Sequence, residues 1–247
     1  MILNAIQDNE ALPPSLAKGR TIPFNKLCNK GGIPGPDDIR FITTLPVFVK
    51  LLEFVIQPDL NKIINDKCKV MPEQMGFKKH NSTQMSMLRT RGVVEDFRNE
   101  GQVRVFELFI DFTQAFDKVP HNNLVHKLKQ KAMPAEQLQR KKILLNTVQA
   151  SLDGELSVQL KIGVAQGGSN SLGDFIIFIN DLLQQIKDRE LVNKQEYIGG
   201  YADDLKFYTV GYRQLKRLIQ FIDSWSTTNG MIVNKKKSGI MKLSRKT

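Results

Sequence analysis

Tyr201-Ala202-Asp203-Asp204 places two adjacent carboxylates between two runs of β-prone residues, 196–200 and 205–210. Two short strands joined by a turn predict a β-hairpin. Aspartate suits such a turn because its short side chain bonds to nearby backbone groups. The hairpin would carry Asp203 and Asp204 to the tip of a sheet, where a metal ion could reach them. The alternative is a pair of solvated acids in a surface turn.

A second candidate carboxylate, Asp111, closes the apolar stretch 103–111. The β-branched and aromatic residues of that stretch predict a strand. An acid at the end of an apolar strand is either exposed at the sheet edge or held by a cation. Asp111 is therefore the second acid that the sequence singles out.

The glycine-rich stretch 163–169 precedes a helix predicted over 171–186. Glycine lets the backbone approach a ligand closely, and the start of a helix offers free N–H groups to phosphate. This pattern alone does not define a phosphate site.

Helical periodicity predicts further helices on both sides of these segments. They cover 45–60, a stretch from Ser82 or Thr83 to the residue before Gly101, 122–130, 136–152 and 214–228, and a last short strand covers 239–243. In the first helix, Leu52 and Ile56 belong to the inward stripe and Glu53 faces water. In the second, Met85, Leu88, Val94 and Phe97 form the stripe. The first forty residues, rich in Pro and Gly, predict loops and short extended pieces, which form a phosphate-handling flap or a surface loop.

The composition indicates a polyanionic partner. Hydrophobic residues make up 41% and charged residues 25%, as in ordinary globular proteins, but the formal net charge is +11. Nucleic acid is the first candidate and an anionic membrane the second. Basic residues cluster in 127–142 and 235–246; a solvated face and a disordered tail are the alternative. Two cysteines, Cys28 and Cys68, favour a reducing intracellular compartment, and no apolar stretch is long enough to span a membrane.

Five segments, in order, resemble reverse transcriptases, nearest to those of non-LTR retrotransposons and related mitochondrial or intron elements. The resemblance runs from about Ile22 to the C-terminus. The matching residues are Lys26 and Arg40 with Gln74-Gly76-Phe77 and Ser82-Thr83; Phe109 to Phe112 with Ala115 to Val119; Gly163-Val164 with Gln166-Gly167 and Ser171-Leu172; Tyr201 to Asp204; and Asn229-Gly230 with Asn234 and Lys237.

The resemblance implies an α+β fold, a right-hand polymerase palm whose antiparallel, ferredoxin-like sheet packs on helices, together with fingers. It assigns residues 1–100 to the fingers and 101–247 to the palm, with a helical segment at 122–162. The chain stops just after the last palm strand, so we expect no thumb, endonuclease or RNase H domain.

The resemblance also implies the metal site. Asp111 and Asp203 would bridge two Mg²⁺ ions, or Mn²⁺, since hard divalent cations prefer oxygen ligands. The Phe112 carbonyl would complete one coordination shell, and Asp204 would ligate or orient. Lys237 would donate a proton to pyrophosphate or contact a phosphate.

The nucleotide pocket follows in the same way. The ring of Phe116 would exclude a ribose 2′-hydroxyl, unless it is an ordinary core phenylalanine. Gln166 and Gly167 would line the pocket, and Lys26 and Arg40 would hold the triphosphate. Departures from the family pattern are Phe41, Ala165, Gly168 and Gly173-Asp174, where the family usually has Pro, Pro, Ser and apolar residues.

The sequence is compatible with two main functions. The first is an RNA-directed DNA polymerase that binds an RNA template and a DNA primer, with other protein chains supplying the missing thumb. The second is a catalytically silent RNA-binding subunit of a ribonucleoprotein, such as an organellar ribosome, holding a structural RNA. An RNA-synthesising polymerase is disfavoured by Phe116. We expect an organellar (mitochondrial) or a nuclear compartment, and the sequence does not decide between them.

Overall fold

The computed structural model describes residues 13–25, 35, 39–66, 69–76, 78, 81–102, 104–152, 156–165 and 167–243. Several residues discussed above lie outside these ranges: Lys26, Cys28, Cys68, Phe77 and Gln166. The chain divides into two compact units, residues 1–61 with 120–174 (unit 1) and residues 62–119 with 175–247 (unit 2). The division into fingers at 1–100 and palm at 101–247 stays a prediction.

Unit 2 is built on an antiparallel sheet. Its strands, in spatial order, are β6 (Ile198–Tyr201), β7 (Asp204–Val210), β3 (Val105–Ile110) and β8 (Gly239–Leu243). Because side chains alternate along a strand, Leu108 and Phe207 share one face of the sheet, and Glu107 and Tyr208 share the other. Both faces are buried at these positions.

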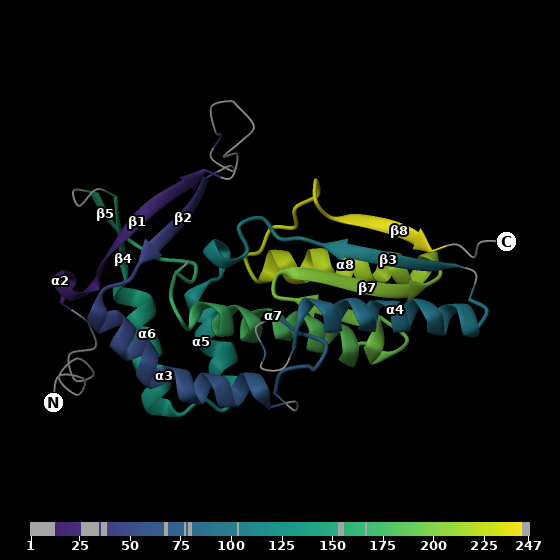
Figure 1. Ribbon diagram of the computed structural model, residues 1–247, viewed down its shortest axis with the longest axis horizontal. Helices are drawn as coiled ribbons and strands as arrows, with labels where there is room; N and C mark the ends of the chain where they lie inside the picture. The colour runs from purple at the N-terminus through teal and green to yellow at the C-terminus, as the bar shows by residue number, and fades with distance from the viewer. Residues whose placement is uncertain are drawn as a thin grey trace. The chain divides into compact units, whose positions relative to one another are not determined.

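Helices cover the two faces of this sheet (Figure 1). α4 (Thr83–Asn99) packs on the face of Tyr208, where the ring centroids of Phe97 and Tyr208 lie 6.0 Å apart. α8 (Tyr212–Thr228) packs on the opposite face. α7 (Ser171–Asp188) contacts α8, with the ring centroids of Phe178 and Trp225 5.8 Å apart. Short 3₁₀ turns, η2 (Phe116–Lys118) and η3 (Gln195–Tyr197), complete the unit.

Unit 1 contains a mixed sheet and a helical core. Its strands, in spatial order, are β2 (Ile39–Thr44), β1 (Lys18–Asn25), β4 (Gln149–Leu152) and β5 (Leu156–Gln159), and only the β1–β4 pair among them is parallel. The helices are α2 (Pro14–Ala17), α3 (Val47–Asn65), α5 (His121–Gln130) and α6 (Ala135–Thr147). Two of the three unit boundaries fall inside α3 and α7, and the third falls between η2 and α5.

The predicted α+β class, with an antiparallel sheet packed on helices, is confirmed. The hairpin, the helices at 122–130, 171–186 and 214–228 and the strand at 239–243 form close to their predicted bounds. Ser82 caps α4 by accepting a hydrogen bond from the Met85 N–H at 3.2 Å, and Gly101 follows the helix end with φ 67°.

The structure corrects other expectations. The predicted helix 136–152 ends at Thr147, since Val148 turns extended and Gln149–Leu152 pairs with both β1 and β5. Sheet pairing there outweighs helix propensity. The N-terminal stretch, predicted as loops and short extended pieces, contains the strands β1 and β2, whose extended pieces pair into a sheet.

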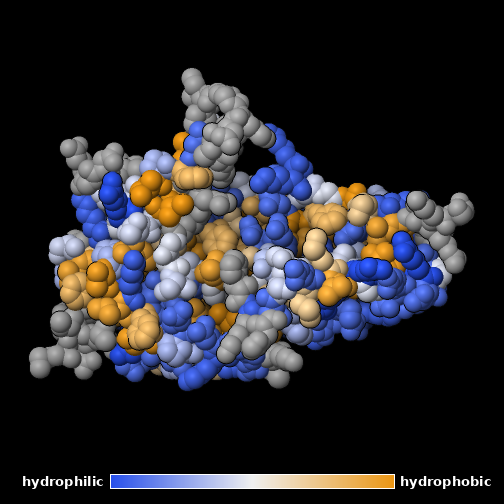
Figure 2. Space-filling view, in the orientation of Figure 1, coloured by the Kyte–Doolittle hydropathy of each residue, from blue (hydrophilic) through white to orange (hydrophobic). Residues whose placement is uncertain are grey.

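The inward stripe of α4 also differs from its prediction. Met85 and Leu88 are 50% and 62% exposed, while Val93 and Phe97 form the buried positions. Figure 2 shows hydrophobic residues scattered among hydrophilic ones over the drawn face, which is ordinary for a protein surface. Within the described ranges, no helix combines the length and apolarity needed to cross a membrane.

Candidate active site

Asp111 and the acidic hairpin meet at one end of the unit 2 sheet. β3 pairs with β7 in a register that sets Ile110 opposite Leu205. Continuing this antiparallel register by one position sets Asp111 opposite Asp204. Acids from two stretches that lie far apart in sequence therefore share one sheet edge.

The hairpin itself is tight. Tyr201 pairs with Asp204, so Ala202 and Asp203 form a two-residue loop. Ala202 has φ 60°, a backbone conformation that such loops usually give to glycine. Asp203 is partly exposed and Asp204 is exposed, so both carboxylates lie at the surface of the unit.

The segment after α8 is fastened to Asp111. Phe112 bridges Val233, with the Thr113 N–H donating to the Ile232 carbonyl and the Asn234 N–H donating to the Asp111 carbonyl, both at 2.8 Å. This bonding pattern does not use the carbonyl of Phe112, which remains a reasonable oxygen ligand. The Ser238 hydroxyl accepts from the Asp111 N–H at 3.1 Å.

Lys237 reaches the same acid. Its Nζ lies 3.9 Å from Asp111 Oδ2, with side-chain exposures of 71% and 20%. The turn that carries Lys237 is organised by Asn234, whose side-chain oxygen accepts from the backbone N–H groups of Lys236 and Lys237. The structure thus brings together Asp111 and Lys237, which were predicted from separate motifs.

The donor set fits a hard divalent cation in part. Carboxylate and carbonyl oxygens are the ligands that Mg²⁺ prefers, and this ion usually keeps several waters and adds substrate phosphates. Yet among the residues with a described position, no group of three or more His, Cys, Asp or Glu side chains could hold a metal by itself. Any ion at Asp111 and the hairpin would therefore need waters or substrate oxygens to complete its shell.

Phe116 stacks on the core of unit 2. Its side chain is only partly buried in η2, and its ring stacks on the fully buried ring of Phe175 with centroids 4.6 Å apart. Burial fixes Phe175. A rigid ring beneath Phe116 would hold that side chain in one position.

The predicted nucleotide loop lies in unit 1. Gly167 has φ 123°, and a Cβ there would lie 2.5 Å from the carbonyl oxygen of Thr43 in β2. Glycine at this position is required both by the backbone angle and by the close approach. Arg40 belongs to β2, and only its backbone is described.

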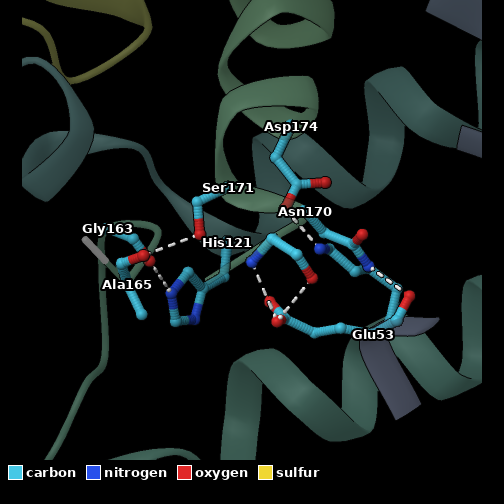
Figure 3. Close-up of polar contacts among 9 residues, drawn as sticks. Glu53, His121, Gly163, Ala165, Asn170, Ser171 and Asp174 are labelled. Carbon is cyan, nitrogen blue, oxygen red and sulfur yellow. Dashed lines mark hydrogen bonds and ion pairs between the residues drawn. The ribbon is translucent and has the colours of Figure 1, made fainter. Parts of the chain in front are cut away.

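A buried polar cluster supports the start of α7 (Figure 3). Asp174, whose charge departs from the family pattern, forms an ion pair with Lys141 of α6, and both side chains are almost fully buried. Burial raises the pKa of the Asp174 carboxyl, against the opposing charge of Lys141. The departure at position 174 therefore has its partner on the neighbouring helix.

His121 completes this cluster. Its Nε2 lies 2.8 Å from the Gly163 carbonyl oxygen, which ties α5 to the loop. Burial lowers the pKa of His121, which favours the neutral ring, although the bond to Gly163 opposes this effect. The geometry gives this histidine a structural role, since it ties α5 to the loop.

Two residues at these sites were not predicted. Glu53, expected to face water, is 5% exposed and accepts hydrogen bonds from the loop. Gln74, matched only as part of a fingers motif, is fully buried against the acidic hairpin. An acid on the polar side of an amphipathic helix gives no sequence signal of burial. A buried glutamine gives none either, beyond its place in the motif.

Sequence comparison places the chain among known proteins. The family model described as reverse transcriptase (RNA-dependent DNA polymerase) matches residues 28–247. An RNA-directed DNA polymerase from the mobile element jockey of Drosophila melanogaster is 27% identical over 216 residues, covering 85% of this chain and 23% of that protein. A probable RNA-directed DNA polymerase from transposon BS of the same organism is 34% identical over 113 residues, covering 44% of this chain and 12% of that protein.

Structural comparison agrees on the fold. Apo telomerase from Candida tropicalis, truncated from its C-terminal domain, superposes with a TM-score of 0.69 at 13% identity, covering 100% of this chain and 55% of that one. Telomerase from Candida albicans, in complex with a fragment of telomeric RNA, gives 0.67 at 12% identity, with 100% and 46% covered.

The chain spans less than a quarter of the length of both mobile-element relatives. The family model nevertheless matches most of this chain, from residue 28 to residue 247. Together with the shared sheet edge of Asp111 and the Tyr-Ala-Asp-Asp hairpin, this match shows that the chain belongs to the reverse transcriptase family.

Proposed function

We propose that this chain carries the nucleotidyl-transfer site of an RNA-directed DNA polymerase, which extends a DNA primer on an RNA template. The observation that carries the proposal is the register that sets Asp111 and the Asp203-Asp204 hairpin at one sheet edge. Its relatives in mobile elements support the same activity. They do not favour the alternative of a silent RNA-binding subunit.

In this proposal Asp111 and Asp203 would hold two divalent cations, with the Phe112 carbonyl and Asp204 as further oxygen donors. Such cations would lower the pKa of the primer 3′-hydroxyl and would stabilise the charge on the leaving pyrophosphate. Most of the remaining catalysis in phosphoryl transfer is positioning. The backbone bonds from Asp111 to Asn234 and Ser238 would provide it on one side.

Lys237 has two roles in the proposal. In the unliganded protein its ammonium balances the charge of Asp111 across 3.9 Å. With substrate bound it would contact the departing phosphate and give up its proton there. Its high exposure leaves the side chain free to move between these positions.

Phe116 would select the sugar, and the loop at Gly167, with Lys26, Arg40 and Gln166, would hold the nucleotide. The basic clusters would neutralise template and primer phosphates, so binding should weaken steeply with salt. The fragment of telomeric RNA is bound to the Candida albicans telomerase. RNA binding by this chain is part of the proposal. A reducing mitochondrial or nuclear location stays a prediction.

Primer extension tests the proposal. The purified chain is incubated with a DNA-primed RNA template, the four dNTPs and Mg²⁺, and products are resolved on a gel. We expect extension by the wild type, none by Asp111→Asn or Asp203→Asn, and undiminished extension by Asp223→Asn, which changes an exposed acid of α8. Template binding, followed by fluorescence anisotropy, should persist in all variants. Equal extension by Asp203→Asn and wild type would refute the assignment.

A further inference from the structure

Among the described residues, hydrogen bonds join the loop 163–170 to α3 through one residue, Glu53. Its Oε2 accepts hydrogen bonds from both the N–H and the hydroxyl of Ser169, each at 3.0 Å (Figure 3). Its backbone carbonyl accepts from the side-chain amide of Asn170, also at 3.0 Å. One residue of α3 therefore fixes two consecutive residues of the loop.

These bonds are of the strong kind. Glu53 is 5% exposed, and within the described ranges no ion pair to it is present. A buried carboxylate without a cation depends on the donors that face it. The donors of Ser169 therefore make charge-assisted hydrogen bonds, which are stronger than neutral ones.

Gly168 leaves the space that Glu53 occupies. A Cβ at position 168 would lie 2.6 Å from Glu53 Oε1 and 2.6 Å from the Ser171 hydroxyl. Real side chains do not tolerate such distances, so a residue larger than glycine would displace the carboxylate. The unusual glycine and the buried glutamate are thus two parts of one arrangement.

Other described residues of the loop are held around this contact. The Ser171 hydroxyl and the Gly168 N–H both donate to the Ala165 carbonyl, at 2.7 and 3.0 Å. His121 holds the other end at Gly163. Glu53 is the member of this set that connects the C-terminal end of the loop to a separate helix.

We propose that Glu53 is a positioning residue for the incoming nucleotide. Through Ser169 it sets the conformation of the loop that presents Gly167, so it acts on nucleotide binding without touching the substrate. This inference rests on the proposed polymerase function. Its signature is an effect on the KM for dNTP that leaves kcat and template binding largely unchanged.

The first test is Glu53→Gln, which keeps the shape but loses one acceptor oxygen and the charge. We expect the KM for dNTP to rise about tenfold, the effect of losing one charge-assisted hydrogen bond. Template affinity and the melting temperature should stay near wild type. Glu95→Gln, at an exposed ion pair with Arg91 on α4, is the matched control for the change in net charge.

The second test changes Gly168 and Glu53 singly and together. Gly168→Ser alone should raise the KM for dNTP, because the new Cβ meets the carboxylate. Gly168→Ser combined with Glu53→Ala removes the overlap with the carboxylate, leaving only that with the Ser171 hydroxyl, and restores a hydroxyl near Ser169. The KM of this double variant should therefore be lower than that of Gly168→Ser alone. A KM for Glu53→Gln equal to that of wild type would overturn the proposal. A raised KM accompanied by an equal loss of template affinity would also overturn it.

A third readout does not need catalysis. Amide hydrogen exchange of peptides covering 163–174, measured with and without dNTP, reports both the fastening of the Ser169 N–H and nucleotide binding. Faster exchange and weaker dNTP protection in Glu53→Gln support the proposal even if the chain extends no primer, an outcome that counts against the polymerase function instead. Unchanged exchange and protection in Glu53→Gln overturn the positioning role.

Discussion

Gln74 holds the backbone of Ala202 with both atoms of its side-chain amide. Its Nε2 donates to the Ala202 carbonyl at 3.0 Å, and its Oε1 accepts from the Ala202 N–H at 2.9 Å and from the Gly76 N–H at 3.1 Å. A Cβ at Gly76 would overlap the Ala202 nitrogen, so the two segments lie backbone against backbone. The residue that precedes Asp203 is thereby fixed at a positive φ that alanine rarely adopts.

Gln74→Leu should misplace the hairpin and lower kcat. The substitution removes both bonds to Ala202, and displacements of about 1 Å at a catalytic group can cost about 100-fold in rate. We expect a fall in kcat of this order with template affinity unchanged, measured by steady-state primer extension. Gln220→Leu, an exposed position of α8, is the matched control.

Adding Ala202→Gly to Gln74→Leu should recover part of the lost rate. Glycine adopts positive φ without the cost that alanine carries, about 1 kcal/mol. The turn then needs less support from Gln74. Wild-type kcat in Gln74→Leu alone would show that the hairpin holds its shape without this glutamine.

Lys237→Gln should separate the two roles proposed for Lys237. A cation binding at Asp111 must displace the ammonium, so its loss should tighten Mn²⁺ binding about threefold, the scale of an exposed ion pair. The loss of the proton donor should lower kcat at the same time. Calorimetric titration and primer extension measure the two effects, with Lys236→Gln as the exposed neighbouring control. Weaker Mn²⁺ binding in Lys237→Gln would contradict the competition.

The sequence was sufficient to predict the acids at the sheet edge, but not the residues that hold them in place. The hairpin and the end of β3 follow from local patterns, because turn residues and β-prone runs act over a few positions. Gln74 and Ala202 are 128 positions apart, and no local pattern in either stretch predicts their contact. Register and burial decide such contacts, and both arise only when the strands pair.

The same reason explains the errors around Glu53 and 148–152. Helical periodicity assigned Glu53 to the solvent side because acids usually lie there. Its burial depends on Ser169, which is brought to α3 by the fold. Likewise, residues 148–152 continue a helical pattern until pairing with β1 makes them a strand.

Phe116→Val should admit ribonucleotides. The ring that would meet a 2′-hydroxyl is removed, while the small β-branched side chain keeps an apolar contact with Phe175. We expect the ratio of kcat/KM for dNTP to that for rNTP to fall by at least about tenfold, measured by single-nucleotide extension. Phe109→Val, at an exposed position of β3, is the control. An unchanged ratio would remove Phe116 from the sugar gate.

The ion pair between Lys141 and Asp174 should be strongly coupled. Removing one partner leaves a buried charge without compensation, at a cost of about 3–5 kcal/mol. We expect Lys141→Met and Asp174→Leu each to destabilise the chain by about this amount, and the double variant to be more stable than either. Urea unfolding measures the three free energies. Additive losses would show that the two side chains do not depend on each other.

Lys78 should make the free energy of unfolding depend on pH. Its ammonium donates to the Met71 carbonyl at 2.7 Å, and burial lowers the pKa of Lys78 from 10.5 to about 8, although Glu73 opposes the shift. Between these two values the unfolded chain binds more protons than the folded chain. The contribution of Lys78 to the free energy of unfolding therefore rises with pH and is lost as pH falls through about 8.

Lys78→Met cannot take up the proton. Its free energy of unfolding relative to wild type should therefore be greatest near pH 7 and decline toward pH 10, as measured by urea unfolding. Lys216→Met, on the exposed side of α8, should show a constant difference. A constant difference for Lys78→Met as well would mean that Lys78 is not desolvated in the folded chain.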